Sequence, residues 1–133
     1  MRPSEKFTKV TGKDGLYNIQ AIENMPSIMR KGLLSNERAK KLAHKSIAMN
    51  EIQARRDLIQ IPNGMKLHQY ANLYFDYWNP MLSRERDQNE NICILKFDKA
   101  VLDFSGVILS DRNASSNYAA FYSVEMGLEK NRF

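Results

Sequence analysis

The apolar segments of this chain are short, and strand-like and helix-like patterns follow one another at irregular intervals. Leu16–Ile22 alternates apolar and polar residues, as a half-buried strand does. Ile92–Phe97 and Val107–Ser110 are short apolar runs that predict two further strands. Because the strands and helices lack the regular spacing of βαβ units, the pattern predicts an α+β fold. No apolar run reaches the ~20 residues that a membrane span requires.

Helix signals are local and lie between these strands. Asn24 is expected to be the N-cap of a short helix that has Pro26 in its first turn and Gly32 as its C-cap. One face of that helix carries Met25, Ile28 and Met29. Longer helical stretches are predicted within residues 37–59 and 113–128, and Asp98 is expected to cap a helical turn.

Residues 71–78 are rich in aromatic side chains and predict another strand. Phe75 and Tyr77 are expected to pack in the core. Tyr74 or Trp78 would then be placed to stack on a nucleobase or on nicotinamide, because an aromatic ring offers a flat apolar face.

Composition indicates one globular domain over residues 1–133. Hydrophobic residues make up 43% and charged residues 26%, which is too apolar for a disordered chain. The single cysteine, Cys93, allows no internal disulfide and fits the reducing cytoplasm, and its apolar neighbours predict that it is buried. His44, His68 and Cys93 lack the spacing of zinc ligands, and Met1–Phe7 lacks the apolar core of a signal peptide. We therefore expect a cytoplasmic protein without a metal.

Positive charge is concentrated in the first half of the chain. Residues 1–60 hold 12 Lys and Arg against 6 Asp and Glu, whereas residues 61–133 hold 8 against 9. A basic half favours an anionic partner such as nucleic acid or a phosphate-bearing cofactor. The alternative is a solvated helix face. Neither a GxGxxG nor a GxxxxGK[ST] phosphate loop occurs in the sequence. The residue pattern by itself therefore predicts only a basic α+β domain with an anionic ligand.

Four segments in series resemble the DarT family, toxins that ADP-ribosylate bases in single-stranded DNA. Residues 16–35 resemble the family's opening strand and helix and end in the turn GLLS. Residues 51–56 read EIQARR, and residues 68–75 read HQYANLYF and are followed by NPML at 79–82. Residues 106–115 read GVILSDRNAS. Together the segments cover most of the chain, from about residue 16 to 122.

The resemblance implies an ADP-ribosyltransferase fold, in which a split β-sheet with flanking helices holds NAD as a substrate, without a metal. Asn18 and Gln20 stand where the family has a His-x-Thr pair that grips a ribose, and both amides can donate and accept hydrogen bonds. Without the resemblance they would be read as the solvent face of a strand. Arg55 and Arg56 cover the family's catalytic arginine, which helps to hold the phosphates and the reacting ribose, and only one of the two is expected to face the cleft. Without the resemblance they would be read as two arginines on a solvated helix. The full expected cofactor-binding set is Asn18, Gln20, Asn24, Leu33, Arg55, Arg56 and Tyr74.

The resemblance also implies contacts with single-stranded DNA. Arg84, Arg86 and Arg112 would follow its backbone if their segments border the cleft. The alternative is a surface of ion pairs, because Glu85, Asp87 and Asp111 are close in sequence.

Family members use a glutamate that lies well beyond the Asp111–Ala114 segment, and this chain ends at Phe133 before the expected position. The chain is then a truncated form, a naturally short relative or an inactive remnant. An active protein would be a toxin paired with an antitoxin. The alternative is a non-catalytic module that binds single-stranded nucleic acid or a nucleotide.

Overall fold

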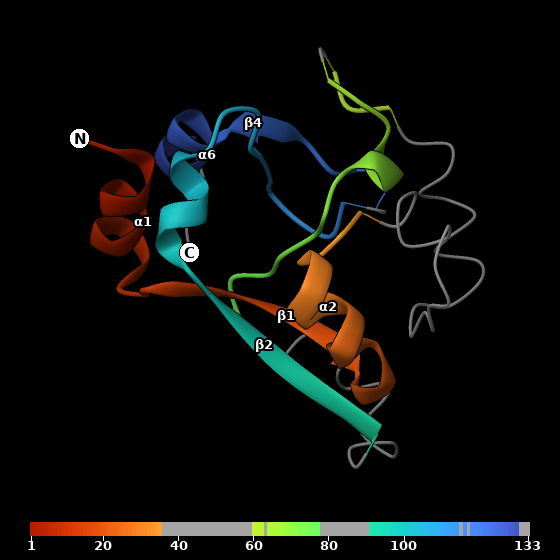
Figure 1. The fold of residues 1–133 in the computed structure, drawn as a ribbon. Helices are drawn as coiled ribbons and strands as arrows, with labels where there is room; N and C mark the ends of the chain where they lie inside the picture. The colour runs from red at the N-terminus through yellow and green to blue at the C-terminus, as the bar shows by residue number, and fades with distance from the viewer. Residues whose placement is uncertain (36–59, 63, 78–90, 115, 117, 131–133) are drawn as a thin grey trace.

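The computed structural model describes residues 1–35, 60–62, 64–77, 91–114, 116 and 118–130 (Figure 1). The helix predicted within residues 37–59 and the side chain of Trp78 lie outside this part. The described elements are α1 (Pro3–Thr11), β1 (Gly15–Ala21), η1 (Ile22–Asn24), α2 (Met25–Lys31), η2 (Leu67–Gln69), β2 (Ile92–Asp98), η4 (Lys99–Asp103), β3 (Ile108–Ser110), β4 (Phe121–Ser123) and α6 (Val124–Lys130).

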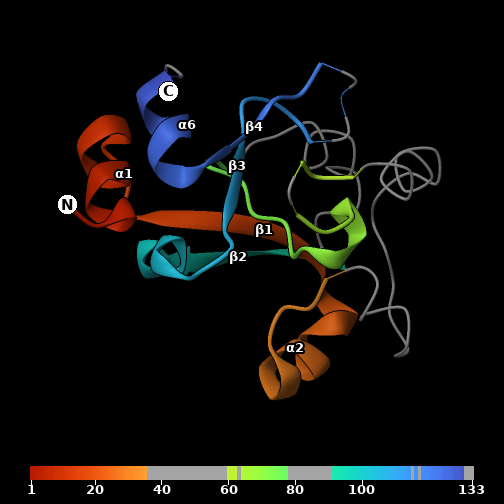
Figure 2. The same cartoon turned by 90° about the horizontal axis from the view of Figure 1, so that it is seen from above.

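The two longest strands, β1 and β2, form an antiparallel pair and lie side by side in both views (Figures 1 and 2). Gly15 is opposite Asp98 at one end of the ladder, and Ala21 is opposite Ile92 at the other. The strands predicted at 16–22 and 92–97 are confirmed to within one residue at each end. The pair joins segments that are far apart in the sequence, so it organises the described fold.

The aromatic segment that predicted a strand over 71–78 pairs with β1 at a single point. Tyr17 and Tyr74 exchange two backbone hydrogen bonds of 2.8 and 2.7 Å, and no ladder extends from this bridge among the described residues. The predicted strand is therefore wrong. The carbonyl of Asn72 accepts from the side chain of Asn18, and that of Phe75 accepts from Lys13.

Phe75 and Tyr77 were both expected to pack in the core, and only Phe75 does so. Phe75 packs edge-on against Phe7 with ring centroids 5.0 Å apart. Tyr77 is 52% exposed and touches the ring of Tyr17 from the side, so its predicted place in the core is wrong.

A short hairpin, β3–β4, forms the second sheet. Ile108 is opposite Ser123 and Ser110 is opposite Phe121, which confirms the strand predicted at 107–110. The helix predicted over 113–128 is wrong for its first part, because its residues 121–123 form β4. Helix α6 begins only at Val124, after Ser123, whose Oγ accepts the N–H of Met126 at 3.3 Å as an N-cap serine does.

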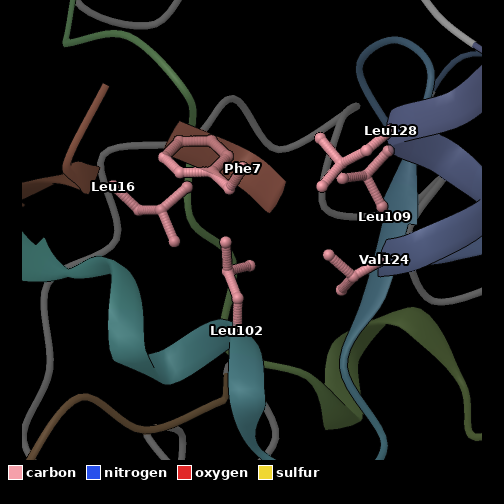
Figure 3. Packing of buried hydrophobic residues seen from close by; sticks show 6 residues of the cluster. All are labelled: Phe7, Leu16, Leu102, Leu109, Val124 and Leu128. Atoms are coloured by element: carbon pink, nitrogen blue, oxygen red, sulfur yellow. The ribbon is translucent and has the colours of Figure 1, made fainter. Parts of the chain in front are cut away.

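The main core joins elements from both ends of the chain (Figure 3). Its side chains come from α1, β1, η4, β3 and α6. They are Phe7, Leu16, Leu102, Leu109, Val124 and Leu128. Helix α1, which no sequence signal had identified, contributes Phe7 to this cluster and so covers the beginning of β1. The described residues include no helix that is long and apolar enough to cross a bilayer.

The predicted caps at Gly32 and Asp98 are present, whereas the predicted burial of Cys93 is not complete. Gly32 ends α2 with a φ of 80° and donates its N–H to Ile28, as predicted for a C-cap. Asp98 Oδ1 accepts the N–H of Ala100 at 2.8 Å, which confirms the predicted cap of a helical turn. The apolar face of α2 is not buried, and Met29 is 78% exposed. Cys93 is half-buried, whereas the sequence predicted a buried thiol.

Candidate functional site

Three side-chain amides at the end of β1 form a hydrogen-bonded chain that we call the amide relay (Asn18, Gln20 and Asn24). Asn24 Nδ2 donates to Gln20 Oε1 at 3.1 Å, and Gln20 Nε2 donates to Asn18 Oδ1 at 2.8 Å. Asn18 Nδ2 then donates to the backbone carbonyl of Asn72 at 2.9 Å. The structure thus brings together three of the predicted cofactor-binding residues.

Local geometry explains how the three residues meet. Asn18 and Gln20 are two positions apart on a strand, so both side chains leave the same face. The 3₁₀ turn η1 then folds the chain back and places Asn24 against Gln20. Asn24 does stand at the N-cap position of α2, but its side chain makes no capping hydrogen bond, contrary to the prediction. The Asn24 side-chain N–H donates to Gln20 Oε1 instead.

The relay is largely removed from water. Asn18 is 8% exposed and Asn24 is 4% exposed, while Gln20 is half-buried. The alternative interpretation, in which Asn18 lies on the solvent face of a strand, is therefore wrong. Burying an amide is unfavourable unless it is hydrogen-bonded. The three hydrogen bonds of the relay provide that compensation and fix the orientation of each amide.

Tyr74 is held next to the relay through the backbone. It is the direct partner of Tyr17, and directly paired residues send their side chains to the same face. Tyr74 therefore leaves on the face of Tyr17, opposite to that of Asn18 and Gln20. The contribution of this segment to the relay is the carbonyl of Asn72, which the sequence did not identify as part of a site. Only its position two residues before Tyr74 in the HQYANLYF motif pointed to it.

Cys93 is the cross-strand partner of Gln20 in the β1–β2 ladder. Burial raises the pKa of its thiol, so the protonated, unreactive form is favoured. Among the described residues, no group of three or more His, Cys, Asp or Glu side chains is placed to hold a metal ion. The relay itself is uncharged and offers amide groups to a ligand.

The remaining predicted residues are separated from the relay or lie outside the described part. Leu33 is half-buried and follows the C-cap of α2, so the length of that helix lies between it and Asn24. Arg112 is in the loop that joins β3 to β4, and its Nε lies 3.6 Å from Asp111 Oδ1. Its side chain is 55% exposed, and an exposed ion pair of this kind is weak. Arg55, Arg56, Arg84 and Arg86 lie outside the described residues.

Asp111 has a structural role that the sequence did not predict. Its Oδ1 accepts the N–H of Ala120 at 2.9 Å, and its own N–H donates to the carbonyl of Ala120 at 3.1 Å. These bonds close the β3–β4 loop at its base. The carboxylate that was expected only to neutralise Arg112 therefore also shapes the loop that carries it.

Comparison with known proteins gives a consistent result. The family described as ssDNA thymidine ADP-ribosyltransferase, DarT, matches residues 17–133. A Thermosipho africanus protein described as a DNA ADP-ribosyl transferase-DNA ADP-ribosyl glycohydrolase fusion protein is 30% identical over 112 residues. The match covers 80% of this chain and 29% of that relative.

Two solved structures have a similar fold. Thermosipho africanus DarTG in complex with ADP-ribose matches with a TM-score of 0.78 and 29% identity, over 85% of this chain and 31% of that one. Thermus sp. 2.9 DarT in complex with ADP-ribosylated ssDNA matches with a TM-score of 0.75 and 27% identity, over 89% of this chain and 62% of that one. The chain thus spans less than two thirds of the length of these relatives.

These matches agree with the architecture described above. The prediction of an α+β fold with a split β-sheet and flanking helices is confirmed, since the described strands form two small antiparallel sheets. The chain carries part of the fold of the longer relatives. The family match begins within β1, includes the amide relay and continues to the end of the chain. This chain belongs to the DarT family.

Proposed function

We propose that this protein transfers the ADP-ribosyl group of NAD to a base in single-stranded DNA, and that the base is thymine. The observation that carries the proposal is the family match over residues 17–133, which includes the three residues of the amide relay. The two structural relatives support it, since one was solved with ADP-ribose and the other with ADP-ribosylated ssDNA.

The relay fits the sugar of such a substrate. Among the contacts of the described residues, Asn18 and Gln20 each use one N–H and one carbonyl lone pair within the relay. An amide has two N–H groups and two lone pairs, so each keeps one donor and one acceptor. A ribose hydroxyl both donates and accepts, and matches this pair. Asn18 and Gln20 would contact the ribose, with Asn24 behind them. Leu33 and Tyr74, which the resemblance also assigns to the NAD site, lie away from the relay and would contact other parts of NAD.

In the proposed reaction the bond between the ribose C1′ and nicotinamide breaks, and nicotinamide leaves with the bonding electrons. A ring nitrogen of the base forms the new bond to C1′ and loses its proton. The role of the protein is to position the two reactants and to complement their charge. Arg55 and Arg56 would hold the diphosphate and the reacting ribose, because a guanidinium is always charged and offers a planar fork of donors. Arg84, Arg86 and Arg112 would contact the DNA backbone.

The proposal also covers the biological setting of the protein. We infer that the protein acts in the cytoplasm as the toxin of a toxin–antitoxin pair, with an antitoxin protein as its second partner. NAD would be its substrate, and no metal would take part. Residues 1–133 would form a single ADP-ribosyltransferase-like domain that carries part of the family fold.

The function can be tested with NAD that carries a radioactive adenylate phosphate. The protein should transfer label to a single-stranded oligonucleotide and much less to the same sequence in a duplex, where a base must first be unpaired. An Arg55→Ala/Arg56→Ala variant should transfer less label, because it loses charge-assisted bonds to the substrate. Binding of oligonucleotide that weakens steeply with salt, with no consumption of NAD at any protein concentration, would instead indicate a non-catalytic binding module.

A further inference from the structure

The amide relay has a direction that is set at one end. The carbonyl of Asn72 can only accept, so Asn18 must present its NH₂ group to it. Asn18 Oδ1 then faces Gln20, which must present its own NH₂ group. Gln20 Oε1 therefore faces Asn24, and the residue at position 24 must be a donor. Each link fixes the orientation of the next amide.

We propose that Asn24 is a positioning residue that acts on the NAD substrate through Gln20. By donating to Gln20 Oε1 it holds the Gln20 amide in the one orientation that is compatible with Asn18 and Asn72. The second N–H of Gln20 and its second lone pair are thereby directed at fixed places on the β1 face. Asn24 is 4% exposed and is the least accessible member of the relay, whereas Gln20 is half-buried and is the most accessible to a ligand. The inference rests on the proposed function.

A carboxylate at position 24 is the sharpest perturbation. The Asn24→Asp substitution nearly preserves the shape of the side chain, but an ionised carboxylate cannot donate a hydrogen bond. Gln20 Oε1 would then face a carboxylate oxygen, and both atoms are acceptors, unless the Gln20 amide flips. Turning it over places Gln20 Oε1 against Asn18 Oδ1, so the conflict moves along the relay and is not relieved. The variant should disturb both amides, because the relay links Asn18 to position 24 through Gln20.

The first measurement needs no ligand. In ¹⁵N-labelled protein, the side-chain amide signals of Gln20 and Asn18 should both shift in the Asn24→Asp variant. Asn91→Asp is the matched control, because Asn91 is exposed and precedes Ile92, which pairs with Ala21 at the same end of the ladder. It adds the same charge near the relay without joining it. Unshifted Asn18 and Gln20 signals in a folded Asn24→Asp protein would overturn the directional relay.

The second measurement is the affinity for ADP-ribose by calorimetry. Asn24→Asp should weaken binding about tenfold relative to Asn91→Asp, as expected for the loss of one well-placed hydrogen bond next to an unpaired acceptor. In a Gln20→Met background the same change at position 24 should alter affinity by less than about twofold, because the residue through which it acts is gone. Thermal unfolding of each variant confirms that the binding protein is folded.

The outcomes are distinct. An equal loss of affinity from Asn24→Asp in the wild-type and Gln20→Met backgrounds would show that Asn24 does not act through Gln20, and would overturn the inference. An unchanged affinity in Asn24→Asp would do the same. A wild-type protein that binds neither ADP-ribose nor NAD would instead contradict the proposed function.

Discussion

Single residues in this protein obtain their roles from partners that are distant in sequence. The sequence placed Asn18 and Gln20 on a strand and, by resemblance, in a cofactor site. It did not reveal that a carbonyl at Asn72 sets the orientation of Asn18, because that contact depends on how residues 71–77 cross β1. Asn24 was predicted as a helix cap from local preference. The tertiary hydrogen bond to Gln20 replaced the local one.

Asp103 likewise contacts a residue far away in the sequence, Ser4 at the start of α1. Its carboxylate accepts the N–H of Ser4 at 2.9 Å and the hydroxyl of Ser4 at 2.6 Å, and so serves as a cap supplied from η4. These two bonds hold the pKa of Asp103 below its ordinary value. We expect Asp103→Asn to lower the melting temperature at pH 7 by a few degrees. Asp14→Asn removes the same charge from an exposed pair with Lys96 and should have a smaller effect.

The effect of Asp103 should depend on pH with a defined sign. A carboxyl whose pKa is lowered by folding stabilises the protein above its unfolded pKa of about 3.9, and this contribution is lost as pH falls through the lower folded value. The difference in melting temperature between wild type and Asp103→Asn should be constant from pH 7 to pH 5 and should shrink below about pH 4. A difference that grows on acidification would contradict this role.

Cys93 gives a second prediction at this scale. Its half-buried thiol has a raised pKa, so the reactive thiolate is scarce near neutral pH. We expect iodoacetamide to alkylate Cys93 several-fold more slowly in the folded protein than in the same protein unfolded in guanidinium, as followed by mass spectrometry. ADP-ribose should slow the reaction further, because Cys93 pairs with Gln20. Equal rates in the folded and unfolded protein would show that the thiol is freely accessible.

At the scale of elements, the sequence predicted those that are set by local signals and failed where distant pairing decides. The alternating pattern at 16–22, the Gly32 C-cap and the Asp98 cap were all correct. The helix predicted over 113–128 failed because residues 121–123 pair with β3, which lies before the loop. Helix α1 was missed because its one fully buried apolar side chain, Phe7, leaves no visible periodicity.

The contact between α6 and β3 allows a test of element packing. Alanine normally stabilises a helix by about 1 kcal/mol relative to glycine. A Cβ at Gly127 would lie 2.5 Å from Leu109 Cδ2 and 3.3 Å from Leu109 Cβ, and Leu109 is a buried core residue. We therefore expect Gly127→Ala to destabilise the protein by about 1–3 kcal/mol, as overpacking does, when measured by urea unfolding.

A matched control distinguishes packing from helix propensity. Met126 is half-exposed on the same helix, and Met126→Ala should change the free energy of unfolding by no more than about 0.5 kcal/mol. Gly127→Ala together with Leu109→Ala should lose less stability than the sum of the two single changes, since the smaller residue makes room for the new methyl group. A stabilised Gly127→Ala protein would contradict the close approach of α6 to β3.

At the scale of the whole molecule, one cluster of side chains ties α1, β1, η4, β3 and α6 together, so residues near both ends of the chain support the strand that carries the relay. This long-range arrangement could not be predicted from composition or periodicity, which indicated only a basic α+β domain. The order and spacing of four motifs predicted the family, and the match over residues 17–133 confirms it. The amide relay, which begins on β1, is a feature of this chain's own residues that the motifs did not reveal.

The proposal that this chain transfers ADP-ribose to thymine in single-stranded DNA can be tested in one step. The most direct measurement is the intact mass of a single-stranded oligonucleotide that contains one thymine, after incubation with the protein and NAD. The same oligonucleotide with cytosine at that position is the control. We expect only the thymine oligonucleotide to gain the mass of one ADP-ribosyl group, with release of one nicotinamide. Unchanged masses for both oligonucleotides, in the presence of folded protein and intact NAD, would contradict it.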